Sequence, residues 1–448
     1  MFQSRGIASA LRFARILLGL CLSLVSCRLR TVDLASSNGT GPGSKAQESL
    51  AAGFESRARS LAAAMSDEEL VGQALIVGVE GVQRLSNGSR SALELIQPGA
   101  VILFGFNVAE DPRQVAVLAS EIRTAAGKNS AAYLPPFIAI DHEGGSVYRF
   151  KGGMTRLPAA KAMGRAGMSA ARMAGAAAGS ELRSIGVTMN AAPVVEALTD
   201  GNRAFLQDRV WSDEPGPAGK LASGFLEACQ SSGAAAVAKH FPGNAEADPH
   251  RGLPVLSAAR ATLDTVYYAP FRDAIRSGVS SIMLSHVLVP AIDPDLPVSV
   301  SAVAIAVLKE RLGFRGIVMT DDLQMAALAG IGGPEAAAVA ALSAGADLLM
   351  VSGGRTALAV RTALLEALAD GRISRARLED AAARIIAQKL RFGLDTETAD
   401  DRDRRLADFG AAVARNRIAL SGAMTEQNAS AYDPNRADAV PRLPWNLR

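Results

Sequence analysis

Histidines, acids and bases recur close together along this chain, in combinations suited to proton transfer. The sequence holds only four histidines, namely His142, His240, His250 and His286. Acidic and basic residues accompany them: Asp141, Glu143, Arg149, Lys239, Asp248, Asp321 and Asp322. Histidine titrates near neutral pH, so it can both give and take a proton under working conditions. We therefore expect one functional cleft in which these residues converge.

The acidic pair after the apolar run Gly316–Met319 suggests covalent catalysis. An aspartate at the mouth of a cleft can attack the anomeric carbon of a sugar. Placing two adjacent carboxylates in one small cavity costs free energy, because like charges repel. Since Asp322 directly precedes a predicted helix start at Leu323–Ala327, we expect it to be a structural residue. Asp321 is then the predicted nucleophile.

A second group must act as the acid and then as the base, and Asp248-Pro249-His250 supplies a candidate. A carboxylate bonded to an imidazole fixes its tautomer and stabilises the imidazolium. The pattern is short, and a solvent-exposed histidine beside an unrelated aspartate is the alternative.

Two other kinds of site are less well supported. Four histidines and several carboxylates could ligate zinc, but the chain has no His-Glu-x-x-His motif and its histidines are dispersed. No Gly-x-Ser-x-Gly motif is present for a serine hydrolase. We therefore predict neither a metal nor a cofactor.

The elements that must position these residues are eight short apolar runs. They are predicted as strands near Ala74–Val79, Ala100–Phe104, Phe137–Ile140, Gly186–Asn190, Ala234–Ala238, Ser280–Leu284, Gly316–Met319 and Asp347–Val351. Continuous apolar runs are typical of parallel strands buried on both faces. Alanine-rich helical stretches separate them, such as Pro112–Ala126, Pro158–Ser184 and Pro334–Ala344.

Eight such units predict an α/β fold, a single (β/α)8 TIM-type barrel, whose chemistry gathers at the carboxyl ends of the strands. An open doubly wound sheet is the alternative, but no glycine-rich phosphate loop follows the first run.

Composition excludes several classes. With 49% hydrophobic and 20% charged residues, the bulk of the 448-residue chain is not disordered, and three cysteines cannot form a disulfide scaffold. The net charge is +3, and Arg5, Arg12 and Arg15 account for it. The rest of the chain has no net charge to attract nucleic acid, so we predict no nucleic-acid partner.

The first residues have the pattern of an export signal. The three arginines precede an uncharged, mostly apolar run, Ile16–Ser26, which is too short to span a bilayer. It ends in Leu24-Val25-Ser26-Cys27, which resembles a bacterial lipobox. We therefore expect Cys27 to be lipidated and the protein to be an exported, membrane-anchored lipoprotein of the cell envelope. An ordinary cleaved signal or an uncleaved anchor is the alternative.

Several segments carry a family resemblance. Val237–Gly243 (VAKHFPG), followed by Asp248-Pro249-His250, resembles the signature of family 3 glycoside hydrolases, and more narrowly the bacterial β-N-acetylglucosaminidases of the NagZ type. Asp141–Arg149 (DHEGGSVYR) resembles their D-x-E-G-G-R-V-x-R segment. Further segments match in order and spacing: Leu157-Pro158, Ala192-Pro193-Val194, Asp208-Arg209, Ser285-His286 and Thr320–Met325. The resemblance runs from about Ser66 to Leu394.

The resemblance implies a retaining, exo-acting β-N-acetylglucosaminidase (a β-N-acetylhexosaminidase), which removes N-acetylglucosamine through a glycosyl-aspartate, with peptidoglycan fragments as expected substrates. Asp321 would be the nucleophile and His250, paired with Asp248, the acid/base. The residues expected to bind the terminal sugar are Asp141, Arg149, Arg209, Lys239, His240 and, with a less defined role, His286. Three positions depart from the family pattern, Ser146, Asn244 and Pro249, and they put the rate and the exact substrate in question.

Alternatives remain at this point. A β-glucosidase-like or phosphorolytic enzyme of the same family is one, and a non-catalytic cell-wall-binding lipoprotein is another. The expected organisation is a signal peptide at 1–26, a flexible tether at 27–50, the barrel at 51–395, and a helical extension with a disordered tail at 396–448.

Overall fold

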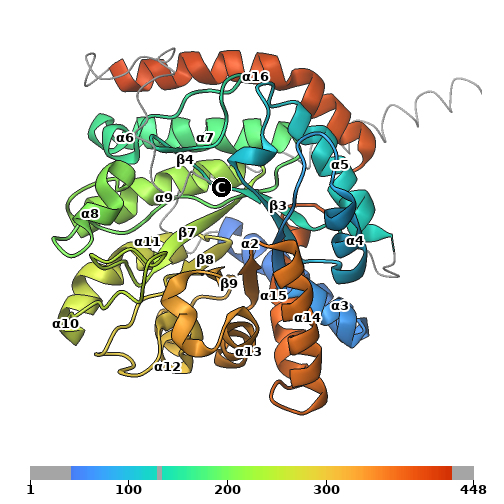
Figure 1. The fold of residues 1–448 in the computed structure, drawn as a ribbon. Coiled ribbons are helices and arrows are strands. Elements are labelled where there is room, and N and C mark those ends of the chain that lie inside the picture. Colours follow the sequence, from blue (N-terminus) through green and yellow to red (C-terminus); the bar gives the residue numbers. More distant parts are fainter. Residues whose placement is uncertain (1–41, 129–133, 426–448) are drawn as a thin grey trace, which may run out of the picture. The chain divides into compact units, whose positions relative to one another are not determined.

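Eight parallel strands close into a barrel in a computed structural model that describes residues 42–128 and 134–425 (Figure 1). Around the barrel the strand order is β1-β10-β9-β8-β7-β6-β3-β2. The strands are β1 (Leu75–Gly78), β2 (Ala100–Leu103), β3 (Phe137–Ile140), β6 (Met189–Asn190), β7 (Ala235–Phe241), β8 (Ser281–Leu284), β9 (Ile317–Asp322) and β10 (Leu348–Val351). All eight predicted runs supply a strand, and the predicted TIM-type barrel is confirmed.

Helices surround the barrel and fill the connections between its strands (Figure 1). They are α2 (Pro42–Ala64), α3 (Asp67–Gln73), α4 (Asn87–Ile96), α5 (Gln114–Gly127), α6 (Ala160–Ala166), α7 (Met168–Ser184), α8 (Arg203–Leu206), α9 (Pro215–Ser231), α10 (Arg260–Thr262), α11 (Ala269–Arg276), α12 (Ala302–Ala306), α13 (Pro334–Ala344), α14 (Gly354–Ala369), α15 (Arg375–Arg391) and α16 (Ala399–Thr425). Short 3-10 or π turns form η1 (Gly105–Asn107), η2 (Gln207–Arg209), η3 (Leu263–Tyr267), η4 (Val298–Val300), η5 (Val307–Arg311) and η6 (Ala326–Ile331). A hairpin of β4 (His142–Gly144) and β5 (Val147–Tyr148) follows β3.

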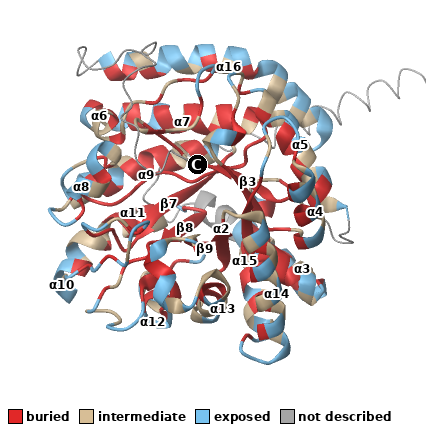
Figure 2. Ribbon diagram, viewed as in Figure 1, coloured by how far each residue is buried: buried red, intermediate tan, exposed pale blue. Residues whose placement is uncertain are grey.

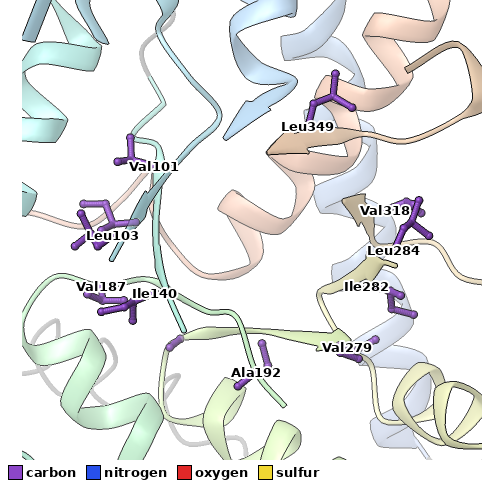
Figure 3. Packing of buried hydrophobic residues seen from close by; sticks show 14 of the residues in the cluster. Val101, Leu103, Ile140, Val187, Ala192, Val279, Ile282, Leu284, Val318 and Leu349 are labelled. Atoms are coloured by element: carbon purple, nitrogen blue, oxygen red, sulfur yellow. The ribbon is translucent and has the colours of Figure 1, made fainter. Parts of the chain in front are cut away.

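The strands are buried on both faces, so each contributes to two apolar layers (Figure 2). Successive side chains of a strand point to opposite faces. In β2, for example, Ala100 and Ile102 belong to the interior cluster, whereas Val101 and Leu103 belong to the outer cluster under the helices. Figure 3 shows members of this outer layer. Any inward-facing residue that continues past a strand's carboxyl end must therefore point into the barrel mouth.

Local signals explain some helix boundaries. Ser66 caps α3 reciprocally with Glu69, as the Ser66-Asp67-Glu68-Glu69 pattern predicts. The predicted single stretch Pro158–Ser184 is two helices, because Gly167 between α6 and α7 has a φ of 95°, which interrupts a right-handed helix.

The N-terminal end of the predicted barrel differs in detail from expectation. Helix α2 begins at Pro42, inside the stretch 27–50 expected as a tether, where alanine, glutamine and glutamate favour helix. At the other end, α16 lies along α7 (Figure 1), and Asn416 donates to Glu181 at 2.9 Å. The signal segment with Cys27, and the tail beyond Thr425, lie outside the described residues. Among those described, no helix combines the length and the apolar content needed to cross a bilayer.

Helix α15 closes the end of the barrel opposite the site and buries a lysine there. Ile385 and Leu394 join the interior cluster, and the Lys389 side chain is fully buried. Its Nζ donates to Gln73 Oε1 at 2.7 Å. Burial lowers the pKa of Lys389 to about 7, because a charged amine without a facing carboxylate is poorly solvated in an apolar interior.

This burial predicts a dependence of stability on pH. The unfolded chain, with an ordinary lysine pKa of 10.5, binds more protons than the folded chain between pH 7 and 10.5. The free energy of unfolding should therefore rise by about 1 kcal/mol per pH unit over this window. The measurement is chemical denaturation at several pH values for wild type, Lys389→Met and the exposed control Lys220→Met. The rise should appear in wild type and in Lys220→Met, but not in Lys389→Met. An equal rise in Lys389→Met would refute the assignment.

Candidate active site

A cavity of about 490 Å³ opens where the carboxyl ends of the strands meet. Its wall combines the loops that follow β2, β3, β7, β8 and β9, and it also includes Phe205 and Arg209 from the segment after β6. Its polar lining consists of Asp141, Glu143, Arg149, Arg209, Lys239, His240, Asn244, His250, His286, Asp321 and Asp322. Of the nine residues predicted to act in catalysis or sugar binding, only Asp248 is absent from this lining, and it contacts His250.

Five charged residues form an alternating chain of ion pairs in the wall of the cavity. Lys239 stands at the centre, with Nζ 2.7 Å from both Asp141 Oδ1 and Glu143 Oε1. Arg149 pairs with the far oxygen of Asp141 at 3.1 Å. Arg209 holds Glu143 with two hydrogen bonds of 2.9 Å. Three cations and two carboxylates leave one net positive charge.

These charges remain ionised although they are buried. Burial alone would raise the pKa of both carboxyl groups. The neighbouring cations outweigh that cost: they hold the pKa of Asp141 well below its usual range and bring that of Glu143 to about 2. Burial lowers the lysine pKa, but the two carboxylates more than compensate, so the pKa of Lys239 is raised. The chain therefore offers fixed charges that can orient sugar hydroxyls.

The β4–β5 hairpin brings two members of this chain into place. Glu143 lies in β4 and Arg149 directly follows β5. Between them, Gly144 and Gly145 have φ values of 95° and 55°. A Cβ at Gly144 would overlap the carbonyl oxygen of Pro158, so this turn requires glycine on two counts.

His240 is oriented by a buried carboxylate that the sequence analysis did not single out. Glu196 Oε1 lies 2.8 Å from His240 Nδ1. Asn244 donates to the same carboxylate from its backbone at 2.6 Å and from its side chain at 2.8 Å. Because a carboxylate faces Nδ1, that nitrogen carries the proton, and Nε2 is the ring nitrogen available to a substrate. Asn244, a departure from the family pattern, thus helps to hold Glu196.

Asp321 and Asp322 have different environments, as predicted. Asp321 continues the inward positions of Ile317 and Met319 and lines the cavity. Asp322 accepts backbone hydrogen bonds from Gln324 and Ser352 at 3.2 and 3.3 Å. The helix expected at Leu323–Ala327 is a turn followed by η6, however, and the next α-helix starts only at Pro334.

His286 lies in the cavity wall with both ring nitrogens engaged. Nε2 is 3.0 Å from the carbonyl oxygen of Asp322, and Nδ1 is 2.7 Å from Ser299 Oγ. Nε2 must donate to the carbonyl, so Nδ1 accepts from the hydroxyl. We therefore interpret His286, expected to bind sugar, as a residue that holds the end of β9 in place.

His250 and Asp248 form a short, partly exposed pair at the cavity rim. His250 Nδ1 lies 2.7 Å from Asp248 Oδ1, and the side chains are 37% and 22% exposed. The carbonyl of Pro249 accepts from the backbone of Ala327 at 3.0 Å. This bond ties the His250 loop to the segment after β9, which carries Asp321.

His142 does not join the other three histidines. It is buried against Tyr148 and Phe150, with ring centroids 4.9 and 5.3 Å away. Burial, assisted by Arg156, lowers its pKa to about 3. The expectation that all four histidines converge is therefore wrong for His142, which packs as an aromatic residue. Within residues 42–128 and 134–425, no three His, Cys, Asp or Glu side chains are grouped to hold a metal.

The sequence of this chain matches the model of a known protein family. Residues 67–388 match the model described as the glycosyl hydrolase family 3 N terminal domain. The chain belongs to glycoside hydrolase family 3. It is accordingly a glycoside hydrolase, and the matched range agrees with the resemblance expected from Ser66 to Leu394.

Relatives in family 3 are similar over most of the barrel. The chain is 38% identical over 293 residues to a beta-hexosaminidase of Methylococcus capsulatus, covering 64% of this chain and 84% of the relative. A family 3 beta-N-acetylglucosaminidase from Paenibacillus sp. FPU-7 superimposes with a TM-score of 0.72 at 34% identity, covering 81% and 69% of the two chains. A beta-N-acetylhexosaminidase from Beutenbergia cavernae gives a TM-score of 0.66 at 27% identity, covering 72% and 98%.

The Glu196–His240 contact yields a prediction. Glu196→Gln removes the negative charge that fixes the His240 tautomer, so kcat/KM should fall by about 10–100-fold. Glu246→Gln, an exposed change on the loop after β7, is the matched control. An unchanged kcat/KM in Glu196→Gln would contradict the positioning role.

Proposed function

We propose that this enzyme removes non-reducing terminal N-acetylglucosamine with retention, through a glycosyl-Asp321 intermediate and with His250–Asp248 as the acid/base pair. The observation that supports it is the meeting of Asp321 and His250 in one cavity whose wall carries the ion-paired chain. A nucleophile, a titratable proton donor and fixed hydroxyl-binding charges are the parts that a retaining glycosidase needs.

The division of roles follows from the environments of the acids. Glu143 cannot act as the general acid near neutral pH, because its pKa of about 2 keeps it ionised. Asp322 has a pKa raised by burial, but its carboxylate is held by backbone donors. His250 is partly exposed to water, and the contact of its Nδ1 with Asp248 orients the ring at the cavity rim.

In the first step, the Asp321 carboxylate attacks the anomeric carbon while His250 protonates the departing oxygen. In the second step, neutral His250 removes a proton from water, which attacks the same carbon and releases Asp321. The Asp248 carboxylate stabilises the imidazolium present between transfers. The charged chain around Lys239 orients the hydroxyls of the terminal sugar in both steps.

N-Acetylglucosamine is the preferred sugar because two similar proteins carry beta-hexosaminidase and beta-N-acetylglucosaminidase names. Together with the export pattern at the N-terminus, this favours peptidoglycan fragments as the source. The preferred sugar is tested by measuring the turnover of a panel of nitrophenyl glycosides with and without phosphate. Turnover of the N-acetylglucosaminide alone supports the proposal. Dependence on phosphate would assign phosphorolysis, and binding without turnover at any pH from about 5 to 8 would assign a sugar-binding protein.

The two catalytic roles predict different responses to azide. Asp321→Asn should lose activity on every substrate, because no covalent intermediate can form. His250→Ala should lose about 10²–10⁴-fold on natural disaccharides and much less on a dinitrophenyl glycoside, whose leaving group needs little protonation. Azide should restore turnover in His250→Ala and give a β-glycosyl azide, since azide attacks without deprotonation. It should not rescue Asp321→Asn.

Asp248→Asn should resemble a milder His250→Ala, and the exposed Glu246→Gln on the same loop should behave as wild type. Product analysis by mass spectrometry and NMR measures these outcomes. If folded His250→Ala kept full activity on disaccharides, or if azide rescued neither variant, the acid/base assignment would be wrong.

We also propose that the protein is exported and lipid-anchored through Cys27, on the lipobox pattern Leu24-Val25-Ser26-Cys27. Two or more acyl chains anchor stably, whereas one binds reversibly. Cys27→Ala should shift the protein from the detergent phase to the aqueous phase, or leave it unprocessed. An unchanged partition and an unchanged mature N-terminal mass would contradict the anchor.

A further inference from the structure

Residues 154–157 connect the C-terminal helix α16 with the β4–β5 hairpin in the cavity wall. Met154, Thr155 and Leu157 are buried, with no more than 2% of their surface exposed. Helix α16 begins at Ala399, beyond residue 388, where the match to the family model ends. Nothing in the chemistry proposed above uses this helix. Its contacts nevertheless reach the sugar-binding charges through residues 154–157.

On the outer side, a buried carboxylate joins this segment to α16. Glu181 on α7 is 1% exposed and accepts from the Thr155 backbone at 2.8 Å and from the Thr155 hydroxyl at 2.5 Å. Asn416 on α16 donates to the same carboxylate at 2.9 Å. The next residue, Arg417, donates to the Met154 carbonyl oxygen at 2.9 Å. Because a buried acceptor that loses a donor is costly, removal of the Asn416 amide would disturb Glu181 and the Thr155 that it holds.

On the inner side, the same segment is bonded to the hairpin. The Leu157 carbonyl oxygen accepts from the Gly145 backbone at 3.1 Å, and Arg156 Nη2 donates to the Gly145 carbonyl oxygen at 3.3 Å. The Arg156 guanidinium also lies over the Tyr148 ring, 4.3 Å from its centroid, which is a cation–π contact. The Tyr148 hydroxyl donates to the Thr155 carbonyl oxygen at 3.4 Å. Three successive residues thus fasten the hairpin to the segment that α16 holds.

The hairpin supplies two charges of the ion-paired chain, Glu143 in β4 and Arg149 directly after β5. The groups assigned to bond cleavage are on other elements, since Asp321 lies in β9 and His250 follows β7. A displacement of residues 154–157 would therefore move groups that orient the sugar and leave the nucleophile and the acid/base in place.

We propose that Asn416, acting through Glu181 and Thr155, is a positioning residue for the sugar-binding hairpin, which makes α16 a functional part of the enzyme. This inference rests on the proposed function, because that function assigns the hairpin charges to the terminal sugar. These charges hold the sugar in the ground state and in the transition state alike. Loss of such uniform binding raises KM and leaves kcat nearly unchanged.

The test exchanges donor and acceptor in the Asn416–Glu181 contact. Asn416→Asp places a second carboxylate against Glu181, and the like charges should separate. The assay uses nitrophenyl β-N-acetylglucosaminide at about pH 8, where two carboxyl groups are less able to share a proton. KM should rise about 10-fold, and kcat should stay within about 3-fold of wild type. Glu181→Gln/Asn416→Asp restores one amide and one carboxylate in exchanged positions, so its KM should return to within about 3-fold of wild type.

Hydrogen–deuterium exchange measures the same connection without a substrate. In Asn416→Asp, the backbone amides of residues 142–149 should exchange faster than in wild type, and those of β8 should be unchanged. Arg417→Met removes the bond to the Met154 carbonyl from an exposed position and should raise KM by about 2–3-fold. Asp408→Asn, an exposed change on the same helix, is the control and should match wild type.

The positioning role is overturned if folded Asn416→Asp keeps the wild-type KM, or if only its kcat falls. Unchanged exchange of residues 142–149, or a double variant no better than Asn416→Asp, would also overturn it. If Asn416→Asp does not fold, an unchanged KM in Arg417→Met decides against the proposal. Absence of N-acetylglucosaminide turnover by wild type refutes the proposed function alone, and faster exchange of the hairpin in Asn416→Asp would then still support the positioning role.

Discussion

Burying Lys239 between two carboxylates is the constraint on which the rest of the site depends. Each buried ion costs several kcal/mol in lost hydration, and only close, multiple pairing offsets this. The charged residues of this chain of ion pairs come from three segments: the end of β3 with its hairpin, the end of β7, and the segment before α9 that carries Arg209. Removing one partner would leave another charge unpaired, at a cost of about 3–5 kcal/mol. The barrel therefore cannot relax at its mouth, and this rigidity keeps Asp321 and the sugar-binding groups in register.

Sequence alone could predict the barrel and much of the site because both follow from strand geometry. Apolar runs of four to six residues identify parallel strands, and side chains alternate along each. Asp141 continues the inward positions Phe137 and Ala139, and Lys239 continues Ala235 and Val237. Convergence of these residues at one mouth is a consequence of parallel strands in a closed sheet. For the acid pair, repulsion between adjacent like charges predicted different roles, and the two residues do have different partners although both line the cavity.

Other features depend on contacts that no local pattern encodes. His142 is adjacent to Asp141 in sequence, yet it packs against Tyr148 and Phe150 because the hairpin returns over it. Glu196 was missed, although it follows the Ala192-Pro193-Val194 segment, because its partner His240 is 44 residues away. Asn244 replaces a residue of the family pattern, but its side-chain amide donates a hydrogen bond to Glu196. The sequence alone could not show that this carboxylate is buried. The turn after Asp322 replaced a helix because its carboxylate binds Ser352 as well as Gln324.

The barrel is closed by pairing β1 with β10, in the register Leu75↔Leu349 to Val77↔Val351. During synthesis from the N-terminus, β1 can pair with β2 as soon as β2 has been made, but its other edge must wait for almost the whole domain. Asp141 likewise precedes its partner Lys239 by 98 residues. An unfinished chain thus carries an open strand edge and unpaired carboxylates together, a state that invites association with other chains. Helix α15, made after β10 and α14, is the element that ends this vulnerable interval by covering the barrel floor.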